Sequence, residues 1–203
     1  MSRYGRISTK VDYERLSVFE PKSLILLDMD GVLADYEKGL VEAWEQHPRA
    51  IENGWLPLRS PDWPAQMKMP PQLRARWGEE AVRLFREITQ TGSYYFDLDT
   101  IPGAREGVQA LEDAGHTVLI CTAPSRHVPS CASEKIQWAE IMLGSGWGEK
   151  TIITRDKTLV LGDYLIDDNP IVSGAQEPKW SHVLFAAPHN QGHIQWAEII
   201  ASL

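Results

Sequence analysis

Cysteine is almost absent from this chain: Cys121 and Cys131 are the only two among 203 residues. Two cysteines cannot build the disulfide framework that stabilises many small secreted domains, and neither lies in a CxxC or zinc-binding spacing. Long apolar runs are also missing, since no stretch approaches the roughly 20 apolar residues of a membrane-spanning helix. Residues 1–20 contain no apolar segment typical of a secretory signal peptide. We therefore expect a cytoplasmic protein without a membrane partner.

Basic residues are fewer than acidic ones, 20 against 28, and the formal net charge is −8. This balance disfavours general affinity for a nucleic-acid polymer, which requires basic patches. A single nucleotide remains an acceptable substrate, because a metal ion and a few local cations can hold one phosphate group.

Short apolar runs recur along the chain and predict the strands of a sheet. They cover residues 24–27, 117–121, 151–154, 164–166 and 183–186. Helical patterns cover residues 104–114, 133–143 and 194–203. This alternation predicts an α/β fold: a Rossmann-like parallel sheet with helices on both faces.

Residues 36–95 differ from the rest of the chain. They are rich in tryptophan and proline, and helical patterns over residues 37–46 and 72–89 flank a proline-rich middle. We predict a small helical cap over residues 36–95, inserted into a core formed by residues 21–35 and 96–203. The sheet is expected to resume near Phe96, and Trp44, Trp55 and Trp77 are expected to form the core of the cap.

Two carboxylates, Asp28 and Asp30, follow the first predicted strand, and Gly31 comes directly after them. Like charges placed side by side repel each other, and a desolvated carboxylate tends to bind a proton. A nearby cation or a covalent role for one carboxylate removes this cost. The alternative is a solvated Asp-Gly turn that ends the strand.

Polar residues also follow three later runs. Thr122 ends the second run, Lys157 follows the third, and Asp167 and Asp168 follow the fourth. Ligands of open α/β sheets bind beyond the carboxyl ends of the strands. Each residue alone could be an ordinary turn or surface residue, but together they predict one site with carboxylates, a hydroxyl and an ammonium group.

These motifs resemble those of the haloacid dehalogenase (HAD) superfamily of phosphohydrolases, and within it the 5′(3′)-deoxyribonucleotidases. The first motif is Asp28-Met29-Asp30-Gly31-Val32-Leu33, and the others are Thr122, Lys157 and the pair Asp167-Asp168. The narrower resemblance also includes His182-Val183-Leu184-Phe185 and His189-Asn190-Gln191. It covers nearly the whole chain after Ser23 and is weakest across the cap.

The resemblance implies a role for each motif. Asp28 would attack phosphorus and form an aspartyl-phosphate, and Asp30 would protonate the leaving oxygen and later activate water. Thr122 would bind a phosphoryl oxygen, and Lys157 would hold Asp28 and the phosphoryl group.

The resemblance also implies Mg²⁺ as the cofactor, which prefers oxygen ligands. Asp28, the backbone carbonyl of Asp30, and Asp167 would bind the ion, with Asp168 in the outer shell or acting through water. A charge count leaves a phosphate dianion unbalanced, so further cations are expected, and Arg126 and Lys135 are the candidates. The alternative for both is a solvated surface charge.

The base pocket is expected to come from the cap. Tyr36 matches an aromatic residue that stacks on the base in the resembled family, and Trp63 and Tyr95 align loosely with other pocket positions. Core packing is the alternative for each. The nucleotidases have serine after the motif threonine, whereas this chain has Ala123. Its backbone N–H can still donate, but the lost hydroxyl could change affinity or substrate preference.

The leading hypothesis is a magnesium-dependent 5′(3′)-deoxyribonucleotidase that acts on dUMP- or dTMP-like monophosphates. The alternatives are a phosphatase of another small phosphate ester, a non-catalytic nucleotide-binding regulator, and an acidic interaction module. The last gives no role to the residues at the strand ends. Because the resembled family is often dimeric, a homodimer also stays open.

Overall fold

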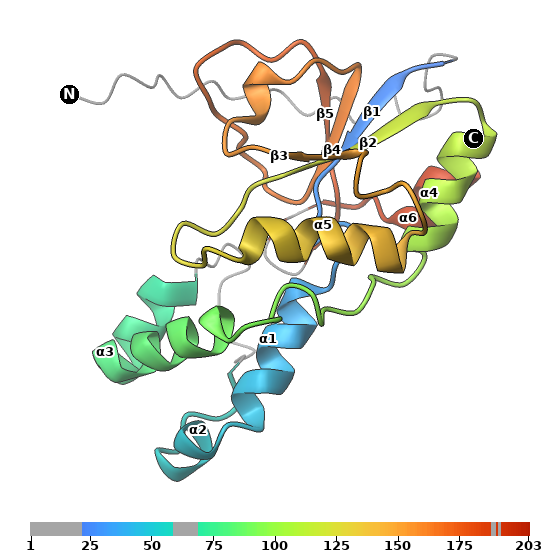
Figure 1. Cartoon of the computed structure of the whole chain (residues 1–203). Coiled ribbons are helices and arrows are strands. Elements are labelled where there is room, and N and C mark those ends of the chain that lie inside the picture. Colours follow the sequence, from blue (N-terminus) through green and yellow to red (C-terminus); the bar gives the residue numbers. More distant parts are fainter. Residues whose placement is uncertain (1–21, 59–68, 188–189, 191) are drawn as a thin grey trace.

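The computed structural model of the chain describes residues 22–58, 69–187, 190 and 192–203. Five parallel strands form one sheet in the order β3-β2-β1-β4-β5 (Figure 1). They are β1 (Leu24–Leu27), β2 (Thr117–Thr122), β3 (Thr151–Ile153), β4 (Tyr164–Asp167) and β5 (Ser181–Leu184). The first four agree closely with the predicted runs. β5 begins earlier than predicted, because polar Ser181 and His182 pair with residues of β4.

The three helices α4 (Ala104–Asp113), α5 (Cys131–Met142) and α6 (Trp196–Ala201) pack against one face of the sheet. Helices α4 and α6 approach closely, since a Cβ atom on Gly107 would lie 2.0 Å from the Trp196 ring. The opposite face is covered by the short 3-10 helix η2 (Lys157–Leu159) and by a small apolar cluster that includes Trp180. The predicted α/β Rossmann-like class is confirmed. Among the described residues, the helical structure on the second face is the single turn η2.

Three further helices, α1 (Tyr36–Glu45), α2 (Pro48–Glu52) and α3 (Met69–Gln90), gather away from the sheet (Figure 1). Their core is a stack of Trp44, Trp55 and Trp77 with ring centroids 5.8 to 6.4 Å apart, as the sequence predicted. Helix α2 was not predicted, although a proline at the first helical position is a known start signal. Gly78, at φ +80°, interrupts the long helix that was expected to be continuous.

The chain enters and leaves this helical region through two segments that lie side by side. The Asp35 N–H donates to the Asp99 carbonyl at 2.8 Å, and the Ile101 N–H donates to the Leu33 carbonyl at 2.8 Å. The prediction that the sheet resumes near Phe96 is wrong: residues 96–116 hold an isolated bridge and α4, and the next strand is β2. The division into a core (21–35 and 96–203) and a cap (36–95) stays a prediction.

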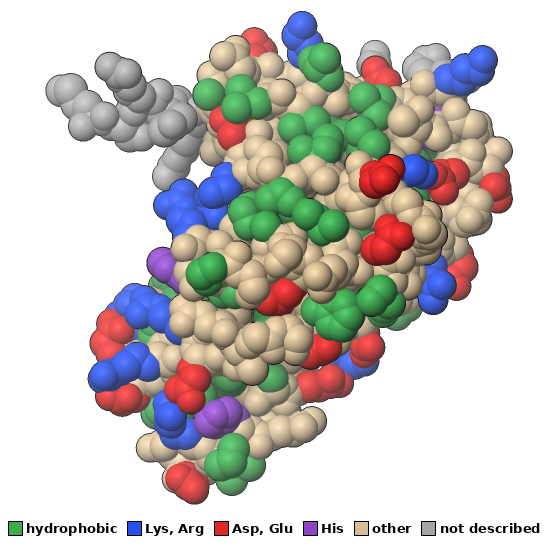
Figure 2. Space-filling view, in the orientation of Figure 1, with side chains coloured by type: hydrophobic (Ala, Val, Ile, Leu, Met, Phe, Trp, Pro, Cys, Tyr) green, Lys and Arg blue, Asp and Glu red, His purple; other side chains and the backbone are tan. Residues whose placement is uncertain are grey.

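The surface mixes charged and apolar side chains. In Figure 2 acidic and basic groups are interspersed over the face shown, so the net charge of −8 is not gathered there into one acidic patch. Within the part of the chain that the structure describes, no helix has both the length and the apolar composition needed to cross a bilayer.

Candidate active site

The carboxyl ends of β1, β2 and β4 meet at one edge of the sheet. Leu27 of β1 is aligned with Ile120 of β2 and Ile166 of β4. The Asp28 N–H extends this pairing by donating to the Ile166 carbonyl at 2.9 Å. The residues that follow these strands are therefore brought together, as parallel pairing predicts.

The loop after β1 turns sharply at Gly31, whose φ is +83°. The Gly31 N–H donates to the Ala34 carbonyl, and the Ala34 N–H donates to the Met29 carbonyl. A Cβ atom at Gly31 would lie 2.2 Å from Asp168 Oδ2. Glycine is thus required twice, for its left-handed backbone and for the close approach of Asp168.

Lys157 joins two of the carboxylates. Its Nζ lies 2.8 Å from Asp28 Oδ1 and 2.6 Å from Asp167 Oδ2, and Lys157 and Asp167 are both buried. Burial acts to lower the pKa of Lys157, but the charges of Asp28 and Asp167 outweigh it and raise that pKa. Burial and the charge of Asp28 raise the pKa of Asp167, while Lys157 opposes them. This group is a compact carboxylate–ammonium–carboxylate bridge.

Lys135 makes a second such contact beside the first. Its Nζ lies 2.7 Å from Asp30 Oδ2 and donates to Thr122 Oγ1 at 2.9 Å. Lys135 is fully buried, although it belongs to helix α5. Asp30 Oδ1 is buried and has no hydrogen-bond partner among the described residues. Burial raises the pKa of Asp30 and Lys135 counteracts this, so the carboxyl group is suited to carry a proton.

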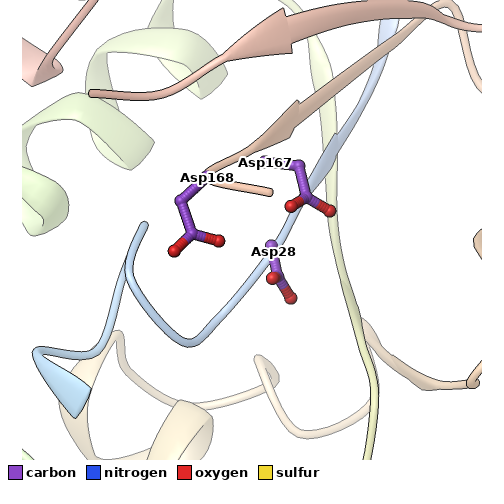
Figure 3. A group of neighbouring side chains, drawn as sticks. All are labelled: Asp28, Asp167 and Asp168. Carbon is purple, nitrogen blue, oxygen red and sulfur yellow. The ribbon is translucent and has the colours of Figure 1, made fainter. Parts of the chain in front are cut away.

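Asp28, Asp167 and Asp168 could hold a metal ion. One carboxylate oxygen from each lies within 4.8 Å of the others, and Figure 3 shows the three side chains grouped beyond the ends of their strands. When ionised, these carboxylates and Asp30 carry four negative charges, against two positive charges on Lys135 and Lys157. The difference of −2 and the all-oxygen donor set fit a hard divalent cation such as Mg²⁺.

Three tyrosine rings cluster next to Lys135. The centroids of Tyr36 and Tyr95 are 6.2 Å apart, and Tyr94 packs edge-on against both. Lys135 Nζ lies 5.6 Å from the centroid of the Tyr95 ring. The structure thus brings the predicted Tyr36 and Tyr95 together and adds Tyr94, which the sequence analysis missed although it adjoins Tyr95. Trp63 lies outside the described residues.

The two candidate cations lie in different places. Lys135 is part of the buried network, whereas Arg126 is exposed in the loop after β2. Ala123 directly follows Thr122 and is half-buried. The structure therefore joins Lys135 to the other predicted site residues and leaves Arg126 outside the buried contacts.

Two polar residues that the sequence analysis gave no role support the site. Asn190 Nδ2 donates to the backbone carbonyls of Asp168 at 2.7 Å and Phe185 at 2.8 Å. Glu134 Oε2 accepts the backbone N–H of Tyr95 at 3.0 Å. Their only sequence signals are the stretch around Asn190 that supported the resemblance, and the position of Glu134 next to Lys135.

Comparison with known proteins shows that the chain is similar to nucleotidases. Residues 22–202 match the profile of the family described as "5' nucleotidase, deoxy (Pyrimidine), cytosolic type C protein". A putative 5'(3')-deoxyribonucleotidase of Bordetella bronchiseptica is 38% identical over 83% of this chain and 86% of its own length. The human cytosolic-type 5'(3')-deoxyribonucleotidase is 38% identical over 82% of this chain and 81% of its own. A solved haloacid dehalogenase-like hydrolase from Xanthomonas campestris has a TM-score of 0.46 and 16% identity, over 87% of each chain.

Proposed function

We propose a reaction for this chain from the premise that it belongs to the cytosolic type C family of deoxy (pyrimidine) 5′-nucleotidases. It is accordingly a phosphomonoester hydrolase of the 5′-nucleotidase type within the HAD superfamily. Our proposal is a magnesium-dependent 5′(3′)-deoxyribonucleotidase that hydrolyses dUMP- or dTMP-like monophosphates through an aspartyl-phosphate. The observation that carries it is the pair of buried lysines, one joined to Asp28 and the other to Asp30.

Asp28 is the proposed nucleophile. The Lys157 ammonium and the Met29 N–H both contact Asp28 Oδ1, at 2.8 Å each. These contacts fix the carboxylate and leave Oδ2 to attack phosphorus. The new bond joins Oδ2 to phosphorus, and the bond between phosphorus and the ester oxygen breaks.

Asp30 is the proposed general acid and base. Lys135 contacts its Oδ2, so the unpartnered Oδ1 can carry the proton that the leaving oxygen receives. The resulting Asp30 carboxylate then takes a proton from the water that attacks the aspartyl-phosphate. The water oxygen bonds to phosphorus and the bond between Asp28 Oδ2 and phosphorus breaks. Inorganic phosphate leaves, and both Asp28 and Asp30 return to their starting states.

Thr122 and Lys135 are proposed to bind the phosphoryl oxygens. The Thr122 hydroxyl accepts a hydrogen bond from Lys135, which leaves its own proton free to donate. Lys135 and Lys157 reach the site from α5 and η2, so positive charge would approach a bound phosphoryl group from two elements.

The proposed Mg²⁺ ligands are Asp28, the Asp30 carbonyl and Asp167, with Asp168 in the outer shell. Bound there, the ion would offset the excess negative charge of these carboxylates and polarise a phosphoryl oxygen as a Lewis acid.

The proposed base pocket uses Tyr36 and Tyr95, with Trp63 and Arg126 as further candidates. Base stacking on an aromatic ring contributes about 1–3 kcal/mol in single-stranded sites and tolerates every base. The Tyr36 and Tyr95 centroids are only 6.2 Å apart, so the base would stack on an outer ring face rather than between the rings. The relatives named above are described as 5'(3')-deoxyribonucleotidases, which supports deoxynucleoside monophosphates as the substrate class. Ala123 is the position where affinity or preference is expected to differ.

The deciding experiment is phosphate release from a panel of deoxy- and ribonucleoside monophosphates and sugar phosphates, with Mg²⁺ and with EDTA. Asp28→Asn should abolish release. Asp35→Asn is the matched control, because Asp35 lies in the same loop but its side chain caps α1 by accepting the Lys38 N–H. Magnesium-dependent release from dUMP or dTMP supports the proposal. Activity on sugar phosphates alone would reject the substrate and keep the mechanism, and a folded but inactive protein would favour a nucleotide-binding regulator.

We also propose a cytoplasmic location, since Cys121 and Cys131 are both free and buried, as expected in a reducing compartment. A homodimer stays a prediction, which light scattering of the purified protein would test.

A further inference from the structure

Lys157 is the first residue of η2, and its neighbour Asp156 caps this single helical turn. Asp156 Oδ1 accepts the Thr158 backbone N–H at 3.0 Å and the Thr158 hydroxyl at 2.5 Å. The Asp156 N–H in turn donates to the Thr154 hydroxyl at 3.2 Å. The backbone after Lys157 is thus tied to the Asp156 carboxylate, and the backbone before it is tied to the Thr154 hydroxyl.

The same carboxylate also holds a second loop, which follows β4. Asp156 Oδ2 accepts the Ala175 N–H at 2.7 Å. A Cβ atom on Gly174 would lie 1.8 Å from Asp156 Oδ1, so this position is open to the carboxylate only because it is glycine. Farther along the loop, the Trp180 indole N–H donates to the Lys157 carbonyl at 3.3 Å. The η2 turn is therefore held against the loop after β4 from two directions.

The electrostatics of Asp156 agree with this role. Partial burial opposes ionisation, but the hydrogen bonds from Thr158 and Ala175 outweigh it and lower the pKa of Asp156. Asp156 is thus a permanent acceptor at neutral pH. It makes three of the strong, charge-assisted bonds that hold a loop in one geometry.

The position of the η2 turn decides where the Lys157 ammonium lies. Its Nζ contacts Asp28 at 2.8 Å and Asp167 at 2.6 Å. A displacement of about 1 Å would lengthen both contacts beyond a normal hydrogen bond. A misplacement of about 1 Å can lower the reaction rate about 10²-fold when the reacting groups must be held in one geometry.

We infer that Asp156 is a positioning residue that clamps η2 to the Gly174–Ala175 loop and thereby holds Lys157 between Asp28 and Asp167. Asp156 itself contacts none of the proposed reacting atoms. The catalytic consequence rests on the proposed function, whereas the placement of Lys157 does not.

The test measures the placement of Lys157 directly. Reductive methylation with formaldehyde and cyanoborohydride, followed by peptide mass spectrometry, reports how accessible each lysine amine is. In the wild-type protein Lys157 and Lys135 should both react slowly, because both are buried and paired. Asp156→Asn places an amide N–H₂ against a backbone N–H, so Lys157 should react several-fold faster while Lys135 keeps its wild-type rate.

A second test variant keeps the experiment decisive if Asp156→Asn folds poorly, and a third variant is the control. Gly174→Ala pushes the carboxylate away from the loop side and should have the same effect as Asp156→Asn. Asp163→Asn is the control, because Asp163 also accepts a backbone N–H, that of Leu24 at 2.7 Å, at the opposite end of β4. It should leave the Lys157 rate unchanged. Equal acceleration of Lys135 and Lys157, or no acceleration of Lys157 in a folded variant, would overturn the inference.

Activity supplies a second readout. Asp156→Asn should lower kcat about 10–100-fold and leave KM nearly unchanged. This is the usual effect of losing a residue that orients an active-site side chain. In a Lys157→Ala background the same substitution should have little further effect, because Asp156 acts through Lys157. Independent effects of the two substitutions would contradict the inference. Faster labelling of Lys157 in a chain without nucleotidase activity would uphold the placement and reject the proposed function.

Discussion

Replacing Lys135 by methionine removes one ammonium group and nearly preserves side-chain volume. Lys135 is fully buried and contacts Asp30 at 2.7 Å and Thr122 at 2.9 Å. In the proposed reaction it also stabilises charge on the phosphoryl oxygens. Removing one such preorganised donor costs about 10²–10³-fold in kcat. We therefore expect a fall of that size in kcat for dUMP at saturating Mg²⁺.

The same substitution should change the pH dependence of the reaction. Burial already raises the pKa of Asp30, and Lys135 is the main group that opposes this rise. Without Lys135 the pKa of Asp30 should rise further, so the limb of the pH–rate profile that needs ionised Asp30 should move to higher pH. Initial rates between pH 5 and 9 measure this shift.

Lys135→Met should also change the stability of the folded protein, by an amount that depends on pH. Removing one partner of a buried ion pair costs about 3–5 kcal/mol when the remaining charge stays ionised. Because the folded-state pKa of Asp30 is raised, the folded variant binds a proton as pH falls, and the destabilisation should shrink at acid pH and be largest at alkaline pH. Urea denaturation at pH 5 and pH 8 checks this.

Lys150→Met is the matched control, since Lys150 pairs with Glu112 at a partly exposed position and the pair should contribute at most about 1 kcal/mol. A Lys135→Met enzyme with wild-type kcat, or with the wild-type pH profile, would refute the reasoning.

Three further predictions concern stability and metal binding. Burial lowers the pKa of His182 from its usual 6.5 to about 4. Between these two pH values the unfolded chain binds a proton that the folded chain does not bind, so the free energy of unfolding decreases as the pH is lowered. His182→Leu should therefore gain about 2 kcal/mol relative to wild type between pH 7 and pH 5 in urea titrations, and a pH-independent difference would contradict this. EDTA should abolish activity, and added Mg²⁺ should restore it. Mg²⁺ should bind more tightly at higher pH, because the raised pKa of Asp167 makes the ion compete with a proton. Calorimetry in two buffers should detect the proton that Mg²⁺ binding releases. Gly31→Ala forces Asp168 aside and should weaken the affinity for Mn²⁺ about 10–100-fold. Electron paramagnetic resonance of Mn²⁺ measures this affinity, and an unchanged value would show that Asp168 does not belong to the metal site.

Much of the fold could be predicted because the first four strands are short, largely apolar runs that end in or before polar residues. Parallel pairing then places Asp28, Thr122 and Asp167 at one edge without any knowledge of side-chain positions. The errors fall where local pattern and tertiary contact disagree. β5 starts with polar residues because its partner strand supplies the hydrogen bonds, and the segment near Phe96 crosses to the core as an isolated bridge rather than a strand.

The sequence by itself determined which chemical groups are available: carboxylates, a hydroxyl and lysines, in the order of a known family. Only the tertiary structure decided how they pair. The sequence named Lys135 as a candidate cation of the site but did not indicate its partner, and the structure buries it against Asp30, 105 positions away. Lys157 lies between Asp28 and Asp167 because Asp156 and a distant loop hold its backbone. The physical reason is that a charge can be buried only where opposite charges and hydrogen bonds surround it, and those partners come from segments that meet only when the chain folds.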